Sequence, residues 1–197
     1  MVTLRINRGF DESERPEAAR LFWQAFAAKL GRVLGPEDRA LRFLHPALDP
    51  RFALGARDGK GQMLGLAGFK TAEGGLVDAG MGDLARVYGW VGALWRGPLL
   101  ELLERPLQPG VFQMDGIFVD ERARGQGVGS ALLAAIRAEA ERSGAGEVQL
   151  DVIDSNPRAK ALYERVGFVA TGTEHTGPLA WVFGFRSATR MRLPLTG

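Results

Sequence analysis

The stretch GIFVDERARGQGVGSALL (116–133) joins an apolar strand pattern to a glycine-rich turn and the start of a helix. Gly125, Gly127 and Gly129 occupy alternate positions, with Arg124 before them and Ser130 after them. Glycine lets a backbone approach a ligand closely, and the amides at a helix N-terminus favour a bound phosphate. A turn that only starts a helix needs one glycine, because each further glycine lowers helix stability. The spacing therefore favours, modestly, a diphosphate site over a simple turn.

Two other phosphate-binding motifs fit this stretch poorly. A Walker-type loop places a lysine and then Ser or Thr after its last glycine, whereas Gly129 is followed by Ser130 and Ala131. A dinucleotide-binding turn has its first glycine directly after the strand, but residues 120–124 separate Val119 from Gly125. A pyrophosphate on a bare helix N-terminus is the interpretation that remains.

Strand and helix patterns alternate on both sides of the glycine stretch. Buried strands are predicted at 111–119 and 148–153, with a helix from about Gly127 to Arg142 between them. Asn156 before Pro157 predicts the capped start of another helix, which Gly167 ends. The remaining elements predicted are strands at 2–7, 168–173 and 188–193, a hairpin at 52–70, and helices from Asp11 or Ser13 to about Leu34 and at 35–44.

Residues 76–110 differ from their surroundings in pattern. Leu84, Val87, Tyr88 and Val91 follow helical spacing, and Gly97-Pro98 is expected to restart the chain as a second short helix. The segment therefore predicts a helical insertion between two strands. With it, the chain is expected to form an α/β (α+β) fold.

Composition limits the classes of function that need to be considered. The 197 residues are 46% hydrophobic and 24% charged, which is typical of a globular protein. The formal charge is only +2 and acidic residues interrupt every basic cluster, so nucleic-acid binding is not expected. The absence of cysteine and the presence of only two histidines argue against a metal site. No apolar stretch suits a signal peptide or membrane span, so a cytoplasmic protein without membrane contact is expected.

Two motifs in the second half of the chain occur together in one known family. Arg124-Gly125-Gln126-Gly127-Val128-Gly129 matches Arg/Gln-x-x-Gly-x-Gly/Ala, and residues 156–168 match Asn-x-x-Ala-x-x-Leu-Tyr-x-x-x-Gly-Phe. In order and separation they resemble the acetyl-CoA-binding core of the GNAT N-acetyltransferase superfamily. The resemblance covers about 111–169, is loose in the N-terminal half and is absent for the insertion at about 76–110. It implies a single N-acetyltransferase domain (1–197) with a mixed, mostly antiparallel sheet flanked by helices.

The resemblance implies roles for the matched residues in binding acetyl-CoA as co-substrate. The amides of the glycine stretch would hold the pyrophosphate: Arg124, Gly125, Gln126, Gly127, Val128, Gly129 and Ser130. The backbone of Ile117, Phe118 and Val119 would run beside the pantetheine arm, where the strand splays from its neighbour, and an amide near Val119 would polarise the acetyl carbonyl. Asn156 would contact the arm in addition to capping its helix.

Tyr163 and Asp115 are the expected catalytic residues. Tyr163 would donate a proton to the leaving thiolate, although its place on the apolar stripe of its helix also suits core packing. Asp115, in the middle of a strand beside the expected slot, is the first candidate for the base, and a strand-end pairing or a water contact is an equally good account of it. Asp151, Glu174, His175 or water are the other candidates for accepting the proton or binding the amine.

The expected activity is acetyl transfer to a primary amine, of a small molecule in the first instance, by direct attack in a ternary complex. An acyl-CoA-binding regulatory module without catalysis, and an enzyme acting on a protein amine, are the alternatives. Trp90, Trp95 and Trp181 suit an acceptor pocket, a core or a homodimer contact equally well.

Overall fold

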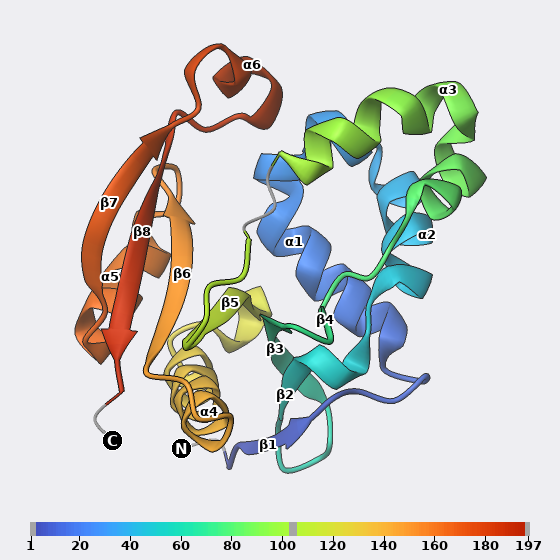
Figure 1. The fold of residues 1–197 in the computed structure, drawn as a ribbon. Coiled ribbons are helices and arrows are strands. Elements are labelled where there is room, and N and C mark those ends of the chain that lie inside the picture. Colours follow the sequence, from blue (N-terminus) through green and yellow to red (C-terminus); the bar gives the residue numbers. More distant parts are fainter. Residues whose placement is uncertain (1–2, 103–105, 196–197) are drawn as a thin grey trace.

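The structure, a computed structural model, describes residues 3–102 and 106–195 and contains one eight-stranded sheet in the order β1-β2-β3-β5-β6-β8-β7, with β4 paired to β3 (Figure 1). The strands are β1 (Arg5–Arg8), β2 (Ala53–Arg57), β3 (Met63–Thr71), β4 (Gly74–Gly75), β5 (Val111–Val119), β6 (Glu147–Ile153), β7 (Val169–His175) and β8 (Ser187–Pro194). The helices are α1 (Arg15–Leu34), α2 (Glu37–Ala47), α3 (Met81–Glu101), α4 (Val128–Arg142), α5 (Pro157–Val166) and α6 (Ala180–Phe183), with short 3-10 turns at Pro50–Phe52, Glu121–Ala123 and Gly177–Leu179.

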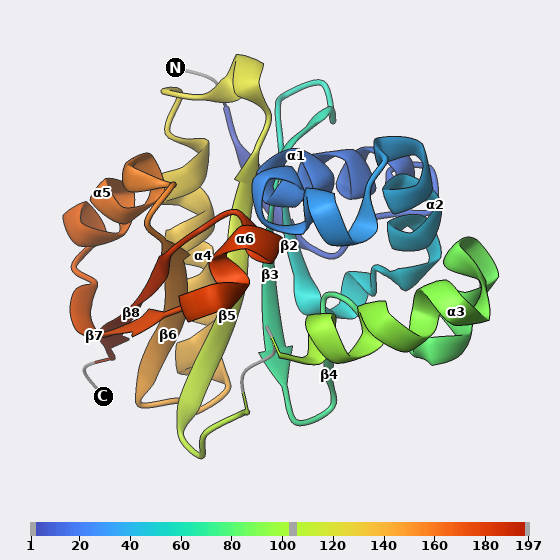
Figure 2. The same ribbon diagram turned by 90° about the horizontal axis from the view of Figure 1, so that it is seen from above.

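The sheet is mixed and mostly antiparallel. Among the described strand pairs, β5 and β6 run parallel and the others run antiparallel. Helices α4 and α5 cover one face, and α1, α2 and α3 lie on the other (Figure 2). The expected α/β (α+β) class with helices on both faces is confirmed. None of the described helices has the length and hydropathy that a membrane-spanning segment requires.

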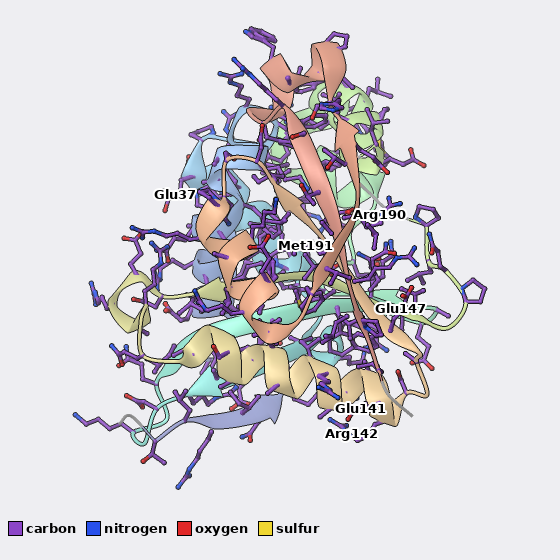
Figure 3. The ribbon with its side chains drawn as sticks, turned by 90° about the vertical axis from the view of Figure 1, so that its left-hand side faces the viewer. Glu37, Glu141, Arg142, Glu147, Arg190 and Met191 are labelled. Atoms are coloured by element: carbon purple, nitrogen blue, oxygen red, sulfur yellow. The ribbon has the colours of Figure 1, made fainter. Side chains whose placement is uncertain are left out.

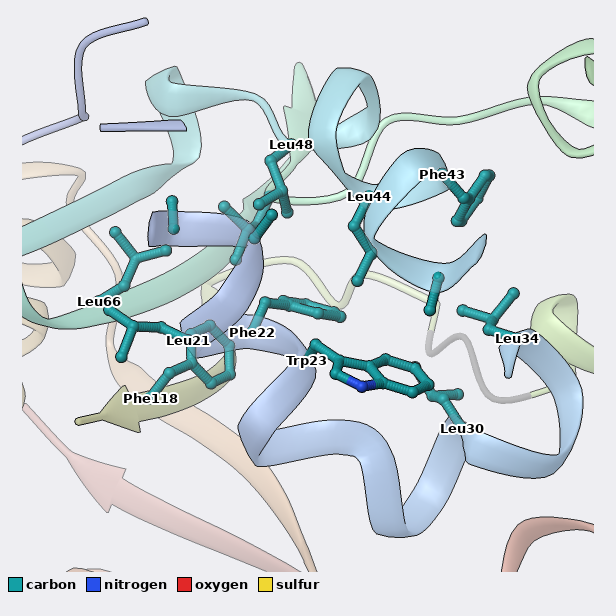
Figure 4. Close-up of a cluster of buried hydrophobic side chains, with 14 of the residues drawn as sticks. Leu21, Phe22, Trp23, Leu30, Leu34, Phe43, Leu44, Leu48, Leu66 and Phe118 are labelled. Atoms are coloured by element: carbon teal, nitrogen blue, oxygen red, sulfur yellow. The ribbon is translucent and has the colours of Figure 1, made fainter. Parts of the chain in front are cut away.

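Helix α1 is held to the sheet by an aromatic cluster. The ring centroids of Phe22 and Phe118 lie 5.2 Å apart, and Phe26 lies 4.6 Å from Phe22 and 5.3 Å from Phe118. Figure 4 shows Leu21 and Phe22 of α1 beside Phe118 of β5 and Leu66 of β3. The apolar residues of α1 recur at helical spacing, so they form the stripe that buries these side chains.

The start of α1 differs from the sequence expectation. Neither Asp11 nor Ser13 caps the helix, because the residue before its first turn is Glu14 and the described chain places no side-chain cap there. The Glu14 carboxylate instead accepts hydrogen bonds of 2.6 Å from Arg57 of β2. The residue before α1 is therefore held by an ion pair with a residue distant in sequence, and its carboxylate also accepts a hydrogen bond from the Asp11 amide (2.9 Å).

The insertion is a pair of helical segments, as expected, but the break lies at a different glycine. The backbone leaves helical geometry at Gly89 (φ 71°, ψ 163°), whereas the helix continues through Gly97 and Pro98. A Cβ atom added at Gly97 would lie 2.4 Å from the sulfur of Met81, so the two segments of α3 pack against each other. The expected restart at Gly97-Pro98 is wrong, because the left-handed backbone that interrupts the helix falls at Gly89, where glycine allows it.

Two polar side chains join α3 to the C-terminal end of α1. The Tyr88 hydroxyl donates to the Leu34 carbonyl (2.5 Å), and Arg96 Nε donates to the Val33 carbonyl (2.7 Å). The Arg96 guanidinium also stacks on the rings of Tyr88 and Trp95. The last carbonyls of a helix have no partner within the helix, and a cation there is favoured by the helix dipole. These contacts set the position of α3 against α1.

Replacing Arg96 with methionine should lower the free energy of unfolding by about 1–3 kcal/mol, because the Val33 carbonyl would lose a charged donor. Urea unfolding measures this change. Arg86→Met on the same helix is the matched control, since Arg86 is exposed and its ion pair with Asp83 joins neighbouring turns. Equal losses in the two variants would show that Arg96 does not fasten α3.

Candidate functional site

Strands β5 and β6 separate in the middle of the sheet. They pair only through Val111–Glu147, Phe112–Val148 and Gln113–Gln149. Beyond this point β5 continues along β3 as far as Val119, while β6 continues along β8 as far as Ile153. The buried side chains of Gln113 and Gln149 are hydrogen-bonded (3.2 Å) at the closed end of the split. The splayed strand implied by the family resemblance is therefore present.

The free side of β5 presents backbone groups to the split. The Asp120 N–H donates to the Leu64 carbonyl on β3, and Val119 is opposite Gly65 in the antiparallel register. Because successive residues of a strand direct their N–H and C=O groups to opposite sides, those of Val119 and Ile117 face the split. An exposed strand edge of this kind can pair with an extended ligand, and its N–H groups can polarise a carbonyl.

The glycine stretch forms an exposed turn that leads into α4. Gly125 and Gly127 have left-handed backbones (φ 77° and 84°), and Gly127 is the residue before the first turn of α4. In the described chain no side chain caps this turn, so the first amides of α4, those of Val128, Gly129 and Ser130, have no partner within the helix. A Cβ atom at Gly129 would lie 2.9 Å from Leu162 of α5, so this glycine allows the two helices to pack closely.

The start of α5 lies beside the split. The Asn156 side chain accepts a hydrogen bond from the Ala159 amide (3.2 Å), which confirms the predicted cap. Asn156, Ala159 and Tyr163 line the same cavity, as their spacing on one helix face requires. Tyr163 is 6% exposed, and burial raises the pKa of its hydroxyl above the ordinary value of 10.0. The hydroxyl is therefore a neutral proton donor at physiological pH.

Asp115 lies at a β-bulge of β5. Gly116 and Met114 are paired with the adjacent residues Gly68 and Phe69 of β3, so Asp115 is the extra residue between them. A bulge redirects a side chain from the regular alternation of the strand. Asp115 is exposed and lines the cavity at the split, which places it where the sequence analysis expected the base.

The other candidate acids and bases differ in whether they line the cavity at the split. Asp151 of β6 lines the cavity and forms an ion pair with Arg190 of β8 (3.7 Å; Figure 3 labels Arg190). Glu174 pairs with the same guanidinium (2.7 Å), and it lies with His175 at the end of β7, which continues beyond the predicted strand at 168–173. Among the described residues that line the cavity, neither Glu174 nor His175 occurs.

The cavity has a volume of about 560 Å³ and extends through the split from one face of the sheet to the other. Tyr163 and Val152 in its wall belong to the core on the α4–α5 face, whereas Phe22 and Leu30 belong to the core on the α1–α2–α3 face. The residues of β5 that line it include Ile117 and Phe118 but not Val119.

Sequence reasoning missed the cavity wall opposite Tyr163. It consists in part of Lys29 of α1, Lys70 of β3, and Leu84 and Leu100 of α3. The helical stripe with Phe22 and Phe26 contained the signal for Lys29, which lies one turn further along α1. Among the described lining residues there is no tryptophan, and Trp90, Trp95 and Trp181 are exposed, so both the pocket and the core interpretations of them are wrong.

Comparisons with known proteins agree with this geometry. The sequence model of the acetyltransferase (GNAT) family matches residues 16–168 of this chain. A mycothiol acetyltransferase of Salinispora arenicola (strain CNS-205) is 46% identical over 66 residues, which are 33% of this chain and only 22% of that protein.

Two solved structures share the fold along nearly the whole chain. A GCN5-related N-acetyltransferase from Kribbella flavida superposes with a TM-score of 0.59 at 19% identity, over 98% of both chains. The crystal structure of an acetyltransferase superposes with a TM-score of 0.62 at 23% identity, over 98% of this chain and 100% of the other chain. Since the family match extends from α1 through the split and the glycine turn to the end of α5, the protein belongs to the GNAT family of acetyltransferases, which use acetyl-CoA as co-substrate.

Proposed function

We propose that the protein transfers the acetyl group of acetyl-CoA to a primary amine of a small molecule by direct attack in a ternary complex. One observation carries this proposal: the cavity joins the two faces of the sheet through the β5–β6 split, with Tyr163 on one face and a separate wall on the other. Two substrates that enter from opposite faces meet in the split. The acceptor would lie against the cavity wall opposite Tyr163, and we call this surface the acceptor wall. Because helix α3 forms part of the acceptor wall, the cavity supports a small molecule over a polypeptide.

The features on the α4–α5 face fit the co-substrate. The pyrophosphate would lie against the turn of Arg124 to Ser130, where the uncapped amides and the helix dipole favour an anion. The pantetheine arm would pair with the β5 edge at Ile117 to Val119, as an added strand does. The Asn156 amide group, whose oxygen caps α5, would use its N–H donors on the arm.

The proposed chemistry needs one acid and one proton acceptor. The substrate ammonium loses a proton to Asp115, or to Asp151 or water, and the neutral nitrogen forms a bond to the acetyl carbon. The Val119 N–H stabilises the carbonyl oxygen as it becomes negative. The carbon–sulfur bond then breaks, the thiolate takes the Tyr163 proton, and a proton from the nitrogen restores the phenol. The net products are the amide, CoA thiol and one proton.

Release of CoA thiol from acetyl-CoA, measured with a series of primary amines, tests the function directly. Amine-dependent thiol release is the expected result. Binding of acetyl-CoA without turnover of any amine in the series would overturn the proposal.

The variant Gly127→Ala should raise the Kd for CoA about tenfold, because the turn that presents the first amides of α4 would shift and weaken a charge-assisted hydrogen bond. S-acetylpantetheine has no pyrophosphate, so its Kd should change little. Gly144→Ala is a matched control at the other end of α4, with a similar backbone (φ 74°) and open space around it. Both variants should lose about 1–2 kcal/mol of stability, and equal effects on CoA binding would contradict the assignment of the pyrophosphate.

The variant Tyr163→Phe should lower kcat about a hundredfold while the Kd for CoA stays nearly constant, because the ring remains and only the proton donor is lost. Since burial raises the pKa of Tyr163, the phenol keeps its proton below its folded pKa. The wild-type rate should therefore not fall between neutral pH and pH 10.0, the ordinary pKa of tyrosine. An equal loss of rate and CoA affinity would assign Tyr163 a structural role.

The variant Asp115→Asn should lower the rate about a hundredfold near neutral pH, where the amine substrate is protonated. The loss should shrink toward pH 10, because an alkylamine with a pKa of about 10 then deprotonates in solution. Asp151→Asn is the parallel measurement. A larger and pH-dependent loss in Asp151→Asn would make that residue the base, and pH profiles unchanged in both variants would assign the step to water.

A further inference from the structure

The cavity continues beyond the catalytic split into an apolar end. On the face opposite Tyr163 its wall is formed by side chains of α1, α2, α3 and the segment before α3. Figure 4 shows several of them from α1 and α2 close together: Phe22, Leu30, Leu34, Phe43 and Leu44. These side chains offer no hydrogen-bond partner, so a polar group placed among them would lose its hydration without compensation.

The described cavity wall also contains charged residues, and two of them belong to the strands that separate. The charged residues are Lys29, Lys70, Glu101, Asp115 and Asp151. Asp115 and Asp151 come from the two strands that separate, so they flank the position of the reacting atoms. The carboxylates suit an ammonium at the split, and the apolar end suits the part of the acceptor that does not react.

Helix α3 determines the shape of this end. Leu84 and Leu100 line the cavity from its two segments, which pack against each other through Gly97. The hydrogen bonds of Tyr88 and Arg96 to the end of α1 fix both segments relative to the α1 wall. The apolar end is therefore a formed surface rather than a gap between loosely placed helices.

We infer that the acceptor is a primary amine with an apolar body, aromatic or branched aliphatic, which lies between α1, α2 and α3 while its nitrogen lies at the split. This inference rests on the proposed function and adds a substrate class to it. The apolar end of the cavity lies on the face opposite Tyr163, whereas the features that fit CoA lie on the α4–α5 face. This location argues for the acceptor as its occupant.

The test compares ethylamine, butylamine and 2-phenylethylamine with ethanolamine as acceptors of acetyl-CoA. The inference predicts that kcat/KM rises up to about fourfold for each methylene that enters the apolar end, with ethanolamine the poorest acceptor. Leu100→Asn should remove this dependence, since it places an amide in the wall where Leu100 is only partly buried. Leu94→Asn on the same helix is the matched control, because Leu94 is 65% exposed and should tolerate the change.

Two further measurements distinguish a failure of the inferred substrate class from a failure of the proposed function. Calorimetric binding of 2-phenylethylamine and ethanolamine to the CoA complex is expected to favour 2-phenylethylamine, and this test needs no turnover. Equal use and equal binding of polar and apolar amines would overturn the inference while leaving the transferase activity in place. A preference for hexanoyl-CoA over acetyl-CoA that Leu100→Asn removes, without an effect on amine choice, would assign the apolar end to the acyl chain and overturn it as well. Selective binding of 2-phenylethylamine without any transfer would overturn the proposed function alone.

Discussion

The separation of β5 from β6 is the constraint on which the rest of the structure depends. Past Gln113 and Gln149 the two strands follow different partners, since the Phe118 ring is packed against Phe22 and Phe26 of α1 while β6 stays paired with β8. The backbone groups of Ile117 and Val119 that face the split lose a strand partner. A buried backbone group without a partner costs about 1–3 kcal/mol, so the split favours water or an extended ligand that forms the missing bonds.

The local parts of the fold follow from sequence rules because their causes are local. Gly127 and Gly144 adopt left-handed backbones at the two ends of α4, and Asn156 caps α5 through an atom three residues away. Such features depend on the conformation of a few neighbouring residues. The start of α1 does not follow the capping rule, because the described chain has no side-chain cap there and Glu14 is held by Arg57, which lies on β2. The break in α3 falls at Gly89, although Gly97-Pro98 has the stronger local signal, and Gly97 instead allows Met81 to pack closely.

The candidate site likewise has a part that follows from local sequence and a part that depends on residues distant in the chain. The motifs between residues 111 and 168 supply the split, the glycine turn, Asn156 and Tyr163, and a continuous segment with two linked motifs is recognisable from sequence. The acceptor wall brings together side chains from α1, α2, β3 and α3, and each of them alone has the pattern of an ordinary core or surface residue. The exposed tryptophans illustrate the difficulty. Their aromatic character suggests a pocket, but helix geometry directs Trp90 to solvent and places Leu84 and Leu100 at the cavity instead.

This division has a physical consequence for specificity. On the face proposed for CoA the features are backbone amides, a cap and one buried hydroxyl, so the proposed binding would depend on main-chain conformation and tolerate little change. The face proposed for the acceptor is lined largely by apolar side chains, and exchange of apolar side chains of similar volume usually costs less than about 1.5 kcal/mol. Because α3 is joined to α1 by hydrogen bonds to carbonyls as well as by apolar packing, a change in the size of Leu84 or Leu100 would leave these hydrogen bonds in place. If the proposed function holds, the same chemistry at the split could serve acceptors of different shape, with selection confined to the face opposite the proposed CoA-binding features.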